Sequence, residues 1–118
     1  MTRGTRIPLP HITVWLSAAR HGNLEKMVML KDMGHTDYNT AFMYAAQAGQ
    51  LAAMKLLMEW GASDYDGALA GAASFGKLET MEFLKDLGAT DYEYALNCAY
   101  EDDQPAAAEL LETWINNY

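Results

Sequence analysis

The sequence repeats itself at an interval of 27 residues. The dipeptide Asp-Tyr begins at Asp37, Asp64 and Asp91, each 27 residues after the last. Glycine recurs at the same interval in two registers, Gly22, Gly49, Gly76 and Gly34, Gly61, Gly88. Such a period is typical of repeat proteins, in which similar units stack and present a surface to a partner. It predicts one domain, 1–118, with units at about 10–36, 37–63, 64–90 and 91–118 after an extended lead-in at 1–9.

Each unit is expected to be a pair of helices. In the second unit, apolar residues at helical spacing fill 38–48, Gly49 interrupts them, and a second helical stripe runs to Gly61. The repeated Asp precedes each first helix, where its carboxylate can cap free N–H groups for about 1 kcal/mol. The following Tyr is expected to pack between units. The fold class is therefore all-α, an α-solenoid of about four helix-turn-helix repeats.

The second helices carry aligned apolar columns that predict a shared core. Met27, Met54 and Met81 form one column, which is either core or a flexible binding surface. Three further columns, expected in the core, are Leu24, Leu51, Leu78; Met29, Leu56, Phe83, Leu110; and Leu30, Leu57, Leu84, Leu111. Unit four departs from the pattern, since Tyr100, Asp103 and Pro105 replace Ala, Gly and Leu. Its polar character is typical of a terminal cap, and the chain is expected to be a complete array.

Composition excludes several classes of protein. No apolar run approaches a membrane span, and residues 1–10 lack the apolar stretch of a secretory signal. The net charge of −8 is concentrated in residues 35–118, which opposes nucleic-acid binding. These acids either keep a monomer soluble or attract a basic protein partner. Cys98, the only cysteine, fits a reducing, cytoplasmic compartment and is expected to be a small buried side chain on a helix.

The repeated motifs resemble the ankyrin repeat. The family's Ala-Ala-x-x-Gly-x-Leu core occurs from Ala18, Ala45 and Ala72, and its Leu-Leu…Gly-Ala ending occurs at 56–62 and, in part, at 83–89. The resemblance covers residues 12 to about 112. Ankyrin units have about 33 residues, and the six missing here fall where the family's projecting β-hairpin finger lies. The Thr-Pro-Leu-His opening is also absent. Short, finger-less units of this kind resemble those of large DNA viruses and some microbial proteins. We expect a cytoplasmic, intracellular location, which for a viral protein means the host cytoplasm.

The resemblance implies a protein-binding function, as an adaptor, inhibitor or effector. In the family, partners usually bind the concave face built from the first helices. The variable positions of that face correspond here to Leu16, Arg20, Met43, Tyr44, Gln47, Ala70, Ser74 and Asn97. The small residues Ala70 and Gly71 beside Tyr44 either form a shallow anchor site or simply let neighbouring helices approach closely.

Other functions find less support in the sequence. A self-associating module that uses an open end of the stack is the main alternative. An enzyme acting on a small molecule or through a metal is a weaker one, because the three histidines lack helical metal-pair spacing and no phosphate loop or nucleophile elbow occurs. The acidic run Glu101–Asp103 is expected to be a solvated end and not a cation site. We therefore expect no enzyme activity, no cofactor, no metal, and a monomer.

Overall fold

A computed structural model describes residues 10–117 of the chain. These residues form eight α-helices and no strand. In chain order the helices are α1 (Ile12–Arg20), α2 (Leu24–Asp32), α3 (Tyr38–Gln47), α4 (Leu51–Trp60), α5 (Tyr65–Ser74), α6 (Leu78–Leu87), α7 (Tyr92–Glu101) and α8 (Pro105–Asn116). The predicted all-α solenoid of helix pairs is confirmed. The lead-in predicted for residues 1–9 lies outside the described residues.

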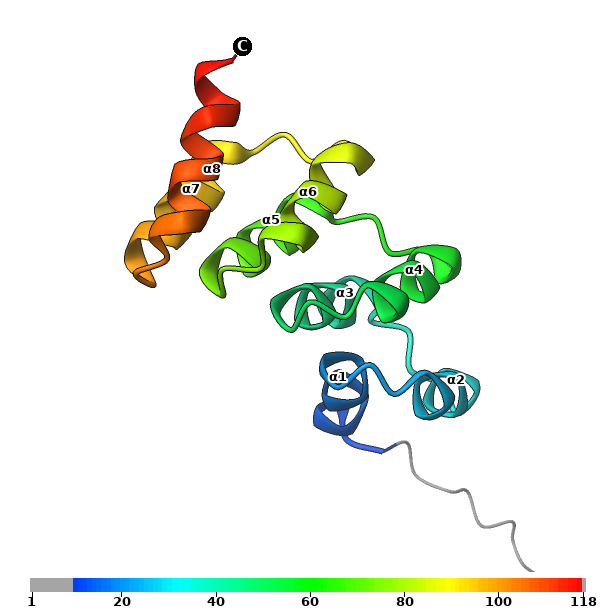
Figure 1. Cartoon of the computed structure of the whole chain (residues 1–118). Coiled ribbons are helices and arrows are strands. Elements are labelled where there is room, and N and C mark those ends of the chain that lie inside the picture. Colours follow the sequence, from blue (N-terminus) through cyan, green and yellow to red (C-terminus); the bar gives the residue numbers. More distant parts are fainter. Residues whose placement is uncertain (1–9, 118) are drawn as a thin grey trace, which may run out of the picture.

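The four helix pairs stack in chain order (Figure 1). The first helices of the units, α1, α3, α5 and α7, pack directly along one another and lie on the inner side of the curved stack. Only residues 61–64 join α4 to α5, and residues 88–91 join α6 to α7. These connectors leave no room for a projecting hairpin, so the finger-less form of the repeat is also confirmed.

Each helix pair begins and ends as the repeat predicts. Asp37, Asp64 and Asp91 stand at the N-caps of α3, α5 and α7, and their carboxylates accept backbone N–H groups three residues later at 3.0–3.2 Å. Gly61 and Gly88 end α4 and α6 with φ of 122° and 115°, a conformation that glycine adopts without strain. Local sequence therefore sets where α3, α5 and α7 begin and where α4 and α6 end.

The core runs through the stack between the two rows of helices. The Met column is fully buried, as are the paired alanines of the first helices in units two and three, which confirms the core alternative for the methionines. Two other expectations were wrong. Leu24 and Leu78 are 38% and 37% exposed because they lie at the start of α2 and α6, beside the turns. Met29 is 53% exposed, whereas its counterparts in later units are half-buried against the core.

A side chain of one unit clasps the connector that leads to the next. The side-chain oxygen of Asn39, in the first turn of α3, accepts the backbone N–H groups of Ser63 and Asp64 at 2.8 and 3.2 Å. Asp66, at the same place in α5, accepts those of Thr90 and Asp91 at 2.7 and 3.1 Å. These bonds satisfy the connector backbone, which explains how so short a segment joins consecutive units.

The junction between units one and two is built differently. Ile12 stands where Asn39 and Asp66 stand in the next two units, and it has no polar atom with which to clasp the connector. Instead, the indole of Trp15 donates a hydrogen bond to the carbonyl of Asp37 at 3.1 Å. Its ring stacks on His35 with a centroid distance of 5.5 Å and on Trp60 at 6.3 Å. Tyr38 packs against both tryptophans, so the Tyr at the helix start does join units here as expected.

Unit four closes its turn without glycine. Asp103 takes the place of the turn glycine and adopts the left-handed conformation, with φ of 56°. Pro105 follows at the first turn of α8, where its missing N–H costs nothing. Cys98 lies on α7 as expected, but it is half-buried and not buried.

Candidate functional site

The first three units form a continuous groove, the inner groove. One hollow of about 360 Å³ lies between α1 and α3 and is lined by Thr13, Leu16, Ser17, Arg20 and Tyr44. A second hollow of about 330 Å³ crosses the turns that follow the first helices and is lined by Arg20, Gln47, Ala48, Phe75 and Lys77. Arg20 lines both hollows, so they are parts of one surface.

Arg20 is the centre of the inner groove. It is the last residue of α1, where a cation also complements the helix dipole. Its guanidinium carbon lies 4.7 Å from the centroid of the Tyr44 ring, which projects from α3 in the next unit. Such a contact is worth about 0.5–1 kcal/mol at an exposed site. It holds an otherwise flexible side chain in a defined position across a unit junction.

The structure brings together half of the residues expected at the partner surface. Leu16, Arg20, Tyr44 and Gln47 line the inner groove. Met43 and Ser74 are half-buried and line neither hollow, and Asn97 is exposed on α7, beyond the groove. That all eight residues meet a partner stays a prediction, and the two hollows are confined to units one to three.

Ala70 and Gly71 are packing residues. Ala70 is only 7% exposed, so it offers almost no surface to a partner. A Cβ atom on Gly71 would lie 3.1 Å from Cγ of Gln47 and 3.2 Å from Cγ of Met43. The absence of a side chain thus lets α5 approach α3 closely, as the second alternative stated. A shallow anchor site at these two residues is not present.

Two residues of the groove were missed by sequence reasoning. Phe75 is 54% exposed and caps the end of α5, and Lys77 precedes α6. Both residues lie in the turn, so they are not among the first-helix positions that the resemblance implies. The signal was present in the repeat, since Phe75 is the only large apolar residue in its column, beside His21, Ala48 and Asp102.

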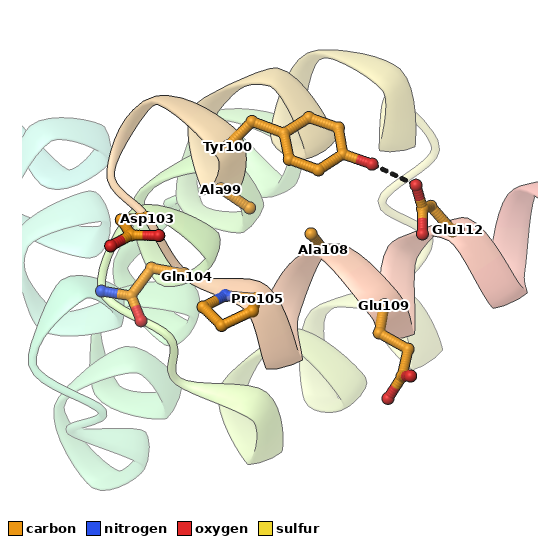
Figure 2. A pocket seen from close by; sticks show the side chains of 8 residues that line it. All are labelled: Ala99, Tyr100, Asp103, Gln104, Pro105, Ala108, Glu109 and Glu112. Atoms are coloured by element: carbon orange, nitrogen blue, oxygen red, sulfur yellow. Dashed lines mark hydrogen bonds between the residues drawn. The ribbon is translucent and has the colours of Figure 1, made fainter.

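A second pocket, of opposite charge, lies at the end of unit four (Figure 2). It holds about 230 Å³ between α7 and α8. Figure 2 shows Tyr100 from α7 reaching Glu112 on α8, with Ala99 and Ala108 between the helices. The lining is Ala99, Tyr100, Asp103, Gln104, Pro105, Ala108, Glu109 and Glu112. Three carboxylates and no cation line this pocket, which contrasts with the inner groove.

Tyr100 is tied to this acidic wall by a hydrogen bond. Its hydroxyl donates to a carboxylate oxygen of Glu112. That bond raises the pKa of Tyr100 above its ordinary value of 10.0, because only the neutral phenol can donate it. Loss of hydration and the negative charge of Glu112 act in the same direction.

Within residues 10–117, no group of three or more His, Cys, Asp or Glu side chains is placed to hold a metal ion. None of the helices described is long and apolar enough to cross a membrane.

Comparison with known families agrees with the geometry. A family model described as ankyrin repeats (3 copies) matches residues 15–95, more than half of the chain. The match begins in α1 and ends in α7, so it contains all of the inner groove except Thr13. No curated protein matches the chain. Together with the all-helical stack of paired helices, the family match establishes that the chain belongs to the ankyrin-repeat family.

Proposed function

We propose that this chain binds a protein partner through the inner groove. Ankyrin repeats are generally protein–protein interaction modules and are typically not enzymes. The observation that carries the proposal is the pair of Arg20 and Tyr44 between two connected hollows. Arginine and tyrosine are among the residues that dominate binding energy at interfaces, above all beside pockets that a partner can fill.

Residues outside the groove have a smaller role in this proposal. Asn97, and the exposed parts of Met43 and Ser74, contact only a partner long enough to extend beyond unit three. The acids of residues 35–118 favour a partner that is basic overall, because a net field steers association.

We also propose a cytoplasmic location, which rests on the single cysteine.

Self-association is the competing function. Met29 and Met33 are exposed at the start of the stack, by 53% and 40%, and would lie in such a contact. However, Lys26 stands in the column where Ala53, Thr80 and Ala107 are buried. A second copy stacked on this end would have to bury the ammonium group, which is costly without a partner charge. The structure of this end therefore favours a monomer.

Photo-cross-linking within cells tests the proposed surface. A photoreactive residue at Gln47, inside the groove, is expected to cross-link to a defined protein. The same residue at Glu59, exposed on α4, serves as the control. Tyr44→Ala should abolish the Gln47 cross-link without lowering the melting temperature. Equal cross-linking from both positions, or none from Gln47, would show that the partner does not use the groove.

A further inference from the structure

The inner groove is electropositive in a chain that is strongly acidic. The chain has a net charge of −8, yet Arg20 and Lys77 line the groove and no carboxylate lines either hollow. Glu79 borders the next hollow, on the far side of Lys77. From this contrast we infer that the groove receives a partner segment that carries a carboxylate next to a large apolar side chain. This inference rests on the proposed function and names the chemistry of its ligand.

Most other cations of the described chain are engaged within the protein. Lys31, Lys55 and Lys85 each lie 5.3–5.9 Å from an aromatic ring centre of the following unit, on Trp60, Phe83 and Trp114 respectively. These contacts join the second helices. Arg20 also stacks on an aromatic ring, but a guanidinium lying over a ring keeps its N–H edges free for other acceptors.

The geometry of Arg20 suits a carboxylate in particular. The planar guanidinium can donate two parallel hydrogen bonds to one carboxylate, and these charge-assisted bonds are about twice as strong as neutral ones. The contact with Tyr44 holds the guanidinium near the groove before the ligand arrives, which reduces the entropy lost on binding. Lys77 supplies a second positive charge at the other end of the same hollow.

Helix dipoles do not override these side-chain charges. Each first helix ends at the groove with its negative pole, and the second helix of the same unit begins a few residues later with its positive pole. The two poles lie close together and largely cancel. Arg20 and Lys77 therefore set the sign of the potential in the groove.

Phe75 and Tyr44 indicate that the ligand carries a large apolar side chain beside its carboxylate. Phe75 is 54% exposed and lines the same hollow as Arg20 and Lys77. Tyr44 and Leu16 continue the apolar surface into the hollow between α1 and α3. A large apolar side chain that fills this surface would remove it from water at about 25 cal/mol per Å².

A nucleic acid is the less favourable occupant. Stacking rings and two cations could hold one phosphate and one base. A longer strand would place successive phosphates near unit four, whose exposed acids include Glu101, Asp102 and Asp103. A single carboxylate on a folded or extended protein segment avoids that repulsion.

The test is selection from a display library of random linear peptides against the whole chain. The wild-type protein is expected to enrich peptides with Asp or Glu within about two residues of a large apolar residue. Arg20→Glu should weaken a selected peptide on the order of tenfold or more, since each 1.4 kcal/mol is tenfold in Kd. Lys26→Glu makes the same charge change on the exposed end of the stack and should leave the Kd unchanged.

The outcomes separate this inference from the proposed function. Suppose that the selected peptides contain no acidic residue but bind the Tyr44→Ala variant more weakly than the wild type. That result would overturn the ligand chemistry but leave the groove as the binding surface. If neither Tyr44→Ala nor Arg20→Glu changes the affinity for the selected peptides, the groove is not their binding surface. Binding of a single-stranded oligothymidylate that is lost in Arg20→Glu would replace the protein ligand with a nucleic acid.

Discussion

Asp64 and Asp66 are two residues apart and hold different parts of the backbone. Asp64 accepts the N–H of Gly67 and caps its own helix, α5. Asp66 reaches forward to the N–H groups of Thr90 and Asp91 in the connector before α7. Asn39 makes the same pair of contacts one unit earlier with a neutral amide oxygen. At the residue scale, the clasp therefore needs an acceptor atom and not a negative charge.

Because the neutral Asn39 and the charged Asp66 make the same two contacts, substitutions of Asp66 test whether the connector needs only an acceptor atom. Asp66→Ala is expected to lower the free energy of unfolding by about 1–2 kcal/mol, because two backbone N–H groups lose their acceptor. Asp66→Asn should cost less than about 0.5 kcal/mol, since Asn39 performs the same role in the preceding unit. Urea denaturation followed by circular dichroism measures both. Equal destabilisation by the two variants would contradict the clasp.

Tyr100 allows a second test at the same scale. Glu112→Gln removes the charge at the acceptor of the Tyr100 hydroxyl, so the pKa of Tyr100 should fall toward 10.0. The raised pKa in the folded chain means that this bond stabilises the fold below pH 10 and that its contribution is lost as the phenol ionises at higher pH. Carbon NMR of ring-labelled tyrosine measures the titration. An unchanged Tyr100 pKa in Glu112→Gln would show that the bond does not form in solution.

At the scale of elements, the turn inside each unit is covered by the unit that follows. Gln50 of unit two lies over Gly22 of unit one, and Gln104 lies over Gly76 in the same way. At Gly49 the covering residue is Lys77, whose nearest atom is more distant. The same residue that places a cation in the inner groove thus also closes a unit junction. Gly22 and Gly49 share nearly the same positive φ, 68° and 72°, so they differ chiefly in what lies above them.

Substitution by alanine separates backbone strain from this contact. Gly49→Ala should cost about 1–2 kcal/mol, the price of a left-handed alanine. Gly22→Ala should cost slightly more, because its Cβ would lie 2.6 Å from Oε1 of Gln50, against 3.6 Å for the nearest atom at Gly49, and the flexible Gln50 side chain would have to shift. The double variant Gly22→Ala, Gln50→Ala should be destabilised only as much as Gly49→Ala, because the contact with Gln50 is then gone. Thermal or urea unfolding of the wild type and the three variants gives the result, and equal costs at both glycines would refute the role of Gln50.

At the scale of the whole molecule, each unit packs mainly on its immediate neighbours. The contacts run from α1 to α3, from α3 to α5 and from α5 to α7. The stability of such a stack is approximately a sum over units and junctions, so the terminal units are the first to open. The second helix of unit one has only Met27 and Leu30 buried, which makes it the most weakly held element.

Hydrogen exchange should show this gradient directly. Amides of α3 to α6 are expected to exchange slowest, and those of α2 to exchange at least about tenfold faster, for a difference of 1.4 kcal/mol or more in local opening. Mass spectrometry of peptic fragments resolves the helices. Uniform protection from α2 to α7 would instead indicate that the four units unfold as one.

Most of what could be predicted from the sequence concerned residues that keep the 27-residue interval, although Leu24 and Leu78 keep it and are exposed. The Asp caps, the stop glycines and the Met core recur in register, so their roles followed from alignment of the units. The clasp could not be found in this way, because Ile12, Asn39, Asp66 and Glu93 occupy one column with different chemistry. Phe75 and Lys77 were missed because burial and groove shape depend on how neighbouring turns meet, which no single unit specifies. Ala70 was misplaced for the same reason.

The clasp has a consequence for how such a chain can change over generations. It contacts only backbone N–H groups, so it places no demand on the side chains of the connector it holds. A tandem duplication of the second unit would bring its own Asp37 cap, its own turn glycine and its own Asn39 acceptor. Both connectors of the new copy would then have an Asn39 acceptor, although Tyr44 would fall where Gly71 now lets neighbouring first helices approach closely. At the level of the connectors, the stack can therefore be lengthened one unit at a time.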